Sequence, residues 1–312
     1  RLIETSQSTF DDTWEQPWGE ARLVRNHHHE LRVLIEETSA APRQLALVFR
    51  VFDDGIGFRY EIPAHPDLAA FIIQDELTEF IYTADHEIWY IPAFQGNRYE
   101  YLYTAARLSE AGTSMHTPMT LRTVDRPAGQ LYVAMHEAAL VDYASMTLRP
   151  SVSLKQASYL LKAKLVPWAN GDAVRAAAPM VTPWRTLQIT RRAADLVTSY
   201  LVLNLNEPNK LGDVSWVQPG KYVGIWWGMH LGLYTWGSGT KHGATTENTK
   251  AYLDFAAANG FRGVLVEGWN VGWSGDWSNN GSAFSFTKAY PDFDLQAVTE
   301  YAAALGVKLI GH

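Results

Sequence analysis

Short apolar runs separated by turn residues fill the first two-thirds of the chain. Residues 45–52 form one such run, and the Asp53-Asp54-Gly55 sequence that follows is typical of a hairpin turn. Helical periodicity is scarce, with short candidates at residues 66–70 and 192–197. Together these patterns favour a β-sandwich. Strands are predicted at residues 31–36, 45–52, 58–62, 79–83, 119–123, 131–136, 159–166, 186–190 and 201–205.

The pattern changes after Pro208. Residues 209–219 are polar and broken by glycine and proline, which is typical of a linker. Buried strands are then predicted at residues 222–227, 263–267 and 307–310. This alternation with helical segments predicts parallel strands joined by crossover helices.

Two helices are predicted between these strands. Thr245 is a candidate cap for a helix through residue 259, and its apolar face is predicted to contain Tyr252, Phe255 and Ala256. Asp294 is the candidate cap of the second helix. Gly260 and Gly306 provide the stop signals.

We therefore expect a β-rich domain over residues 1–215 and the first part of a (β/α)8 barrel over residues 216–312. A full barrel typically needs ~250 residues, so three strands leave it incomplete. The fold class expected from the pattern is thus a sandwich followed by an incomplete barrel.

Composition narrows the function classes. The chain of 312 residues has a formal net charge of −7, which gives no basic footprint for nucleic acid. It has no apolar run long enough for membrane insertion. It also has no cysteine, so the sequence does not indicate an oxidising or a reducing compartment. No signal peptide is visible, as expected for a mature exported protein. Six of the 12 tryptophans lie between Trp226 and Trp277, and aromatic faces stack on sugar rings.

Chemistry in βα barrels gathers at the carboxyl ends of the strands. Trp226, Trp227 and His230 follow the first predicted strand, and Trp227 is preferred over Trp226 because neighbouring strand residues face opposite ways. Glu267 follows the second strand, with Trp269 and Asn270 close behind. His312 follows the third. Aromatic, carboxylate and imidazole side chains on one rim suit a sugar.

Other candidates are weaker. Asp53 and Asp54 suggest a cation site, but a plain turn explains them better without further ligands. His136-Glu137 lacks the second histidine of a zinc-protease helix. Glu100 alone is as readily a surface carboxylate as a site residue.

Several runs together resemble glycoside hydrolase family 97. In the second domain they are Lys241-His242-Gly243-Ala244-Thr245-Thr246 and Gly263-Val264-Leu265-Val266-Glu267-Gly268-Trp269-Asn270-Val271-Gly272-Trp273. In the first domain they are Glu15-Gln16-Pro17-Trp18-Gly19-Glu20, Asp53-Asp54-Gly55-Ile56-Gly57-Phe58-Arg59-Tyr60, Tyr99-Glu100-Tyr101-Leu102-Tyr103, Met135-His136-Glu137-Ala138-Ala139-Leu140 and Thr182-Pro183-Trp184-Arg185-Thr186. The runs occur in collinear order over almost the whole chain.

The resemblance implies an N-terminal β-super-sandwich, a catalytic barrel and one active-site Ca2+. It implies exo-acting hydrolysis of α-linked oligosaccharides by a periplasmic or secreted enzyme. Glu100 matches the family's calcium-ligating glutamate of the sandwich. Trp227, Glu267, Trp269 and His312 are the expected substrate-binding residues, and the catalytic carboxylates are expected beyond residue 312.

Within the family an inverting α-glucosidase is favoured over a retaining α-galactosidase. Two hypotheses from other functional classes are also consistent with the sequence: a non-catalytic carbohydrate-binding protein, and a sugar isomerase or epimerase. Two or more carboxylates at later strand ends favour the hydrolase, whereas a metal cluster or a lysine or histidine base favours the isomerase. The sequence leaves the oligomeric state undetermined.

Overall fold

The computed structural model describes residues 1–96, 100–124, 129–153, 158–275 and 281–312. The chain divides into two compact units, Arg1–Gly212 and Asp213–His312. Each unit has its own sheets and its own core. No helix in the described ranges has the length and apolar character needed to cross a membrane.

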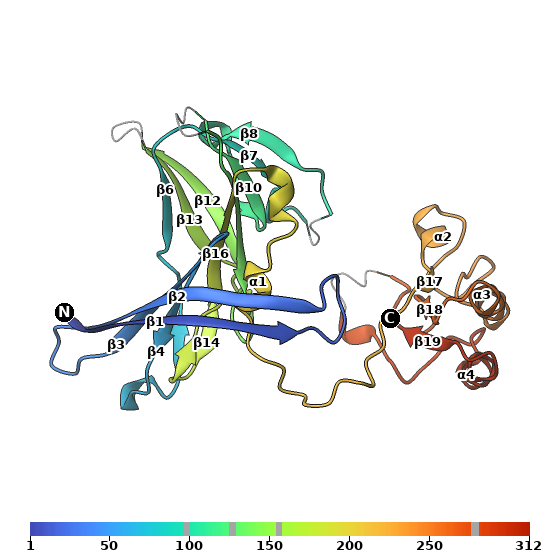
Figure 1. Ribbon diagram of the computed structural model, residues 1–312. Helices are drawn as coiled ribbons and strands as arrows, with labels where there is room; N and C mark the ends of the chain where they lie inside the picture. The colour runs from blue at the N-terminus through green and yellow to red at the C-terminus, as the bar shows by residue number, and fades with distance from the viewer. Residues whose placement is uncertain (97–99, 125–128, 154–157, 276–280) are drawn as a thin grey trace. The chain divides into compact units, whose positions relative to one another are not determined.

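The described part of the first unit contains a ten-stranded antiparallel sheet in the order β1-β2-β3-β4-β16-β11-β10-β7-β8, with β15 paired to β4. Its long β1–β2 ribbon is evident in Figure 1. The strands are β1 (Leu2–Glu15), β2 (Leu23–Glu36), β3 (Gln44–Phe52), β4 (Gly55–Ile62), β7 (Glu87–Tyr90), β8 (Thr104–Arg107), β10 (Met119–Arg122), β11 (Tyr132–Ala138), β15 (Met180–Val181) and β16 (Trp184–Thr190).

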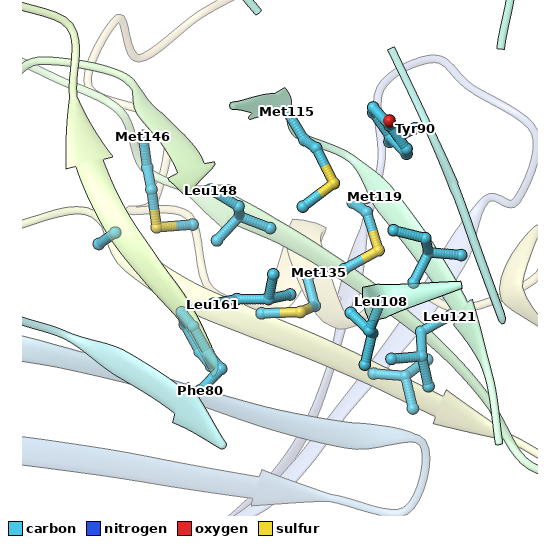
Figure 2. Packing of buried hydrophobic residues seen from close by; sticks show 13 residues of the cluster. Phe80, Tyr90, Leu108, Met115, Met119, Leu121, Met135, Met146, Leu148 and Leu161 are labelled. Carbon is cyan, nitrogen blue, oxygen red and sulfur yellow. The ribbon is translucent and has the colours of Figure 1, made fainter. Parts of the chain in front are cut away.

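A second sheet has the order β6-β13-β12-β9, and a two-stranded sheet pairs β5 with β14. Apolar side chains from the two larger sheets meet in one core, which confirms the predicted β-sandwich. Figure 2 shows four methionines of this core, Met115, Met119, Met135 and Met146. The strands are β5 (Phe71–Ile73), β6 (Glu79–Tyr82), β9 (Met115–His116), β12 (Met146–Ser153), β13 (Ser158–Leu165) and β14 (Val174–Ala176).

The prediction of a strand at residues 201–205 is wrong. The segment forms the short helix α1 (Leu201–Asn204), and the Leu205 amide donates to the Leu201 carbonyl at 3.1 Å. Leu201 and Leu205 lie four residues apart and are both buried in a core with Trp184. A short apolar run does not distinguish strand from helix, and the i, i+4 burial decides it. The candidates at 66–70 and 192–197 form the 3-10 turns Pro66–Leu68 and Ala193–Leu196, and a third lies at Leu108–Glu110.

The second unit contains the parallel strands β17 (Tyr222–Ile225), β18 (Gly263–Val266) and β19 (Lys308–Gly311). They are connected through α2 (Trp227–His230), α3 (Thr246–Ala258), the 3-10 turn Gly281–Ala283 and α4 (Leu295–Ala304). In Figure 1, α3 and α4 lie on the same side of the strands. The predicted βαβαβ order is confirmed. Three parallel strands occur in open sheets as well as in barrels, so the incomplete (β/α)8 barrel stays a prediction.

Both predicted helix caps are confirmed. The Thr245 hydroxyl accepts from the Asn248 amide at 3.1 Å, and the Asp294 carboxylate accepts from the Ala297 amide at 3.0 Å. The predicted face of α3 is wrong in one residue, because Phe255 is exposed and Leu253 is buried instead. Phe255 stacks on Phe261, which packs against the edge of the core.

Candidate functional site

The parallel sheet brings two of the predicted site residues together. Val266 of β18 pairs in register with Gly311 of β19, so the residues that follow them leave the sheet at the same edge. Glu267 and His312 are those residues, and Glu267 Oε1 lies 3.7 Å from His312 Nδ1. The Glu267 side chain is only 17% exposed, whereas that of His312 is 62% exposed.

Trp236 holds the other oxygen of this carboxylate. Its indole N–H donates to Glu267 Oε2 at 3.1 Å. Glu267 thus has a hydrogen-bond donor on one oxygen and an imidazole beside the other. Trp236 was not predicted as a site residue, although it belongs to the tryptophan cluster noted in the sequence.

A chain of aromatic rings leads from Trp236 toward the end of β17. Trp226, Trp227 and His230 pack against one another beyond β17, and the His230 ring meets Trp236 edge to face at 5.1 Å. Trp227 remains 56% exposed, as a sugar-stacking side chain needs to be. The predicted role of His230 as a rim residue therefore fits its position.

The aromatic group continues through Trp273. Its ring is nearly parallel to that of Trp236, at 6.4 Å and 7°, and its centroid lies 6.0 Å from that of His312. An open cavity of about 620 Å³ lies beside this pair, and its wall includes Ser238, Lys241 and Ser274. Apolar faces with a few polar groups are the usual composition of a small-ligand site.

The structure places Trp269 apart from this rim. Trp269 is only 6% exposed, and its ring centroid lies 5.8 Å from that of Phe293 in the core of the second unit. Its indole N–H has no hydrogen-bond partner. Substrate contact by Trp269 is thus not supported by its position, because its ring lies in this core rather than on the rim.

Asn270 is fully buried and has a supporting part. Its side-chain oxygen accepts from the Trp273 indole N–H at 3.0 Å, and its amide donates to the Ser285 carbonyl at 3.1 Å. Asn270 therefore orients Trp273 rather than facing the rim.

The turn after Glu267 depends on a glycine. Gly268 has φ +81°, and a Cβ there would lie 2.6 Å from the Trp236 carbonyl oxygen. The Gly268 carbonyl oxygen lies 2.8 Å from Nε2 of His242, and the Asp292 Oδ2 atom lies 2.8 Å from Nδ1 of the same ring. Burial opposes ionisation of Asp292, but the His242 hydrogen bond and charge outweigh it and hold the pKa of Asp292 below its usual value.

In the first unit, two of the family-like runs meet in a buried ion-pair cluster. The Arg185 guanidinium is fully buried and contacts Glu76 through Nε at 2.8 Å and Glu137 through Nη1 at 2.7 Å. The Glu137 carboxylate also accepts the Met146 amide, and Glu76 accepts the hydroxyls of Thr78 and Tyr143. We therefore interpret the residues of these two runs as stabilising the sandwich.

Glu100, the predicted calcium ligand, is exposed and directly follows the gap at residues 97–99. The described residues contain no group of three or more His, Asp or Glu placed to share a metal ion. Asp53 and Asp54 form the β3–β4 hairpin turn, as the plain-turn interpretation predicted.

Two family models match the chain. One described as Glycosyl-hydrolase 97 N-terminal matches residues 1–208, and one described as Glycoside hydrolase 97 matches residues 226–312. A solved glycoside hydrolase family 97 enzyme from Pseudoalteromonas sp. strain K8, in complex with acarbose, is 49% identical with a TM-score of 0.89. That match covers 100% of this chain and 46% of the other chain. An enzyme of that family and strain in complex with panose matches equally well.

A curated retaining alpha-galactosidase of Bacteroides thetaiotaomicron is 25% identical over 340 residues. This match covers 99% of the chain and 47% of the relative. A β-arabinopyranosidase structure at 22% identity, with a TM-score of 0.73, shares the fold. The chain spans about half the length of the relatives it matches.

Proposed function

Because this chain belongs to glycoside hydrolase family 97, we propose that the protein is an exo-acting α-glucosidase that hydrolyses α-gluco-oligosaccharides with inversion of the anomeric centre. The observation that carries the proposal is the position of Glu267. It lies at a strand end between Trp236 and His312, on an aromatic rim suited to a pyranose ring.

The choice of glucoside rests on relatives. The enzymes at 49% identity were solved with acarbose and panose, and panose is a trisaccharide of α-linked glucose. Glu267 is then a hydroxyl-binding carboxylate whose orientation is set by the Trp236 indole. Trp227, which is exposed at the same rim, supplies a stacking face.

Glu267 is not assigned to bond cleavage. Glycoside hydrolysis uses two carboxylates, roughly 6.5–9.5 Å apart in inverting enzymes and about 5 Å apart in retaining ones. In the described part of the second unit, Asp292 is bound by His242 and Asp294 caps α4, so neither supplies a second free carboxylate on the rim. We therefore assign Glu267 to substrate binding.

Calcium forms part of the proposal through Glu100. Ca2+ takes about six to eight oxygen ligands, and the described residues bring no such set together. Glu100 is an exposed carboxylate and fits one ligand position, so the residues present do not form a calcium site alone.

The second candidate is a retaining α-galactosidase, which the curated relative at 25% identity favours. Turnover of p-nitrophenyl α-glucoside and α-galactoside by the full-length protein separates the two. NMR of the anomer released first separates inversion from retention. Preference for the galactoside with retention would overturn our choice, and sugar binding without turnover of either substrate would support a carbohydrate-binding protein.

A further inference from the structure

His242 links the loop after β17 to two points in the chain after β18. It lies in the loop between β17 and α3, and its side chain is fully buried. One ring nitrogen faces the Gly268 carbonyl, directly after Glu267, and the other faces Asp292, at the far end of the long loop that follows β18. Neither proposed catalysis nor sugar stacking explains this arrangement.

Both partners of His242 are acceptors. A carbonyl oxygen has no proton to give, so the Nε2 atom is a donor to Gly268. The Asp292 carboxylate oxygen Oδ2, 2.8 Å from Nδ1, is likewise an acceptor. Nδ1 is then also a donor, and a histidine that donates from both nitrogens is an imidazolium. The Tyr290 ring packs edge-on against it at 5.5 Å and adds no charge.

The Gly268 carbonyl is a sensitive point at which to hold this loop. Gly268 adopts a left-handed conformation against the Trp236 carbonyl, and Trp236 in turn binds Glu267 through its indole. Fixing the Gly268 peptide therefore fixes the direction in which the Glu267 side chain leaves the backbone. One loop thus holds Glu267 at two points, through His242 and through Trp236.

We propose that His242 is a positioning residue, whose buried imidazolium binds the Gly268 carbonyl and thereby orients Glu267 toward the sugar hydroxyls. The proposal rests on the proposed function for the role of Glu267. The hydrogen-bond state of His242 itself does not depend on it, and the two parts are tested separately.

Two substitutions divide the contacts of His242. The amide nitrogen of asparagine falls near the Nδ1 position and that of glutamine near the Nε2 position. His242→Asn therefore keeps a donor to Asp292 and loses the Gly268 contact, whereas His242→Gln does the reverse. We expect His242→Asn to raise KM for the α-glucoside roughly tenfold with a smaller effect on kcat, because one charged hydrogen bond is lost. His242→Gln is expected to stay within about threefold of wild type.

A double-mutant cycle with Glu267→Gln tests whether His242 acts through Glu267. We expect the KM effect of His242→Asn to shrink below about twofold in the Glu267→Gln background, since the group it orients is then altered. If His242→Asn raised KM equally in the wild-type and Glu267→Gln backgrounds, the positioning role would be overturned. It would also be overturned if His242→Asn and His242→Gln raised KM equally and in proportion to their loss of thermal stability. A wild-type protein that hydrolyses no α-glycoside defeats the proposed function instead.

Proton NMR of the full-length protein labelled with 15N-histidine tests the imidazolium without substrate. The chain has ten histidines, so the signals of His242 are identified by their loss in His242→Gln. We expect two ring N–H protons on His242 that exchange slowly at neutral pH. A single ring N–H would overturn the double-donor assignment.

Discussion

The indole N–H of Trp236 donates to Oε2 of Glu267 across 3.1 Å, which joins the loop after β17 to the first residue after β18. The carboxylate is mostly buried among rings, so a donor on one of its oxygens both lowers its desolvation cost and restricts its rotation. This contact carries a direct consequence for substrate binding.

Replacing Trp236 by phenylalanine removes the donor and keeps most of the apolar surface. We expect Trp236→Phe to raise KM for p-nitrophenyl α-glucoside by roughly fivefold, the size of a lost hydrogen bond of about 1 kcal/mol. Trp216→Phe is the matched control, because Trp216 is 70% exposed and contributes nothing to the rim. Identical steady-state kinetics for the two variants would remove the Trp236–Glu267 bond from substrate binding.

Gly268 offers a second test of the same geometry. A Cβ at Gly268 meets the Trp236 carbonyl at 2.6 Å, whereas a Cβ at Gly260, with a similar φ of +70°, meets nothing within 4 Å. Gly260→Ala is therefore expected to cost only the left-handed conformation, about 1 kcal/mol in the free energy of unfolding. Gly268→Ala adds the clash and is expected to lower kcat/KM at least tenfold as well. Equal urea midpoints with unchanged kinetics in both variants would contradict this.

The sequence predicted those parts that depend on local chemistry. The Asp53-Asp54-Gly55 turn and the Thr245 and Asp294 caps are set by residues within a few positions of one another. The parallel order of β17, β18 and β19 follows from the alternation of strand and helix patterns. Because parallel strands end at one edge of a sheet, the sequence also predicts that Glu267 and His312 lie close together.

What the sequence did not reveal depends on partners distant along the chain. Strand β1 is exposed throughout and its few apolar residues follow no strand period, so its pairing with β2 is what defines it. Trp236 and His242 owe their roles to Glu267, Gly268 and Asp292, which follow 26 to 50 residues later. His242 stood in a family-like run, yet nothing in its neighbours predicts two acceptors for its ring.

The calcium proposal is tested at Glu100. Glu100→Gln in the full-length protein replaces a charged oxygen ligand by a neutral one, so we expect roughly tenfold weaker Ca2+ binding by titration calorimetry, with a loss of activity. Glu4→Gln is the control, since Glu4 is also an exposed glutamate of the first unit. Unchanged calcium affinity in Glu100→Gln would remove Glu100 from the site.

Removing Arg185 is expected to destabilise the sandwich strongly. Arg185→Met leaves Glu76 and Glu137 buried without their cation, and a broken buried pair typically costs about 3–5 kcal/mol in the free energy of unfolding. Arg25→Gln breaks an exposed pair with Asp11 and should leave the urea midpoint near wild type. A midpoint for Arg185→Met that matches Arg25→Gln would show that the buried cluster contributes little.

The two carboxylates of this cluster respond to pH in opposite directions. Burial raises the pKa of Glu76, but its hydrogen bonds and charge interaction with Arg185 outweigh this and hold the pKa below the usual value of 4.5. Burial dominates at Glu137 and holds its pKa above 4.5, in spite of Arg185 and the Met146 amide. Glu76 therefore stabilises the fold above pH 4.5 and loses this contribution as the pH falls through its lowered pKa. The contribution of Glu137 is present below pH 4.5 and is lost as the pH rises through its raised pKa.

Two amide variants separate these contributions. We expect the destabilisation by Glu76→Gln to be largest near neutral pH and to diminish on acidification below pH 4.5, because wild-type Glu76 then becomes protonated. The destabilisation by Glu137→Gln should instead diminish as the pH rises above 4.5, since the amide resembles the protonated carboxyl that the burial of Glu137 favours. Urea unfolding of each variant and wild type between about pH 3 and pH 7 measures both slopes. Glu76 accepts the hydroxyls of Thr78 and Tyr143, whereas Glu137 accepts the Met146 amide, so the two carboxylates have different surroundings. If the destabilisation by both variants changed with pH in the same direction, the opposite pH responses of Glu76 and Glu137 would be wrong.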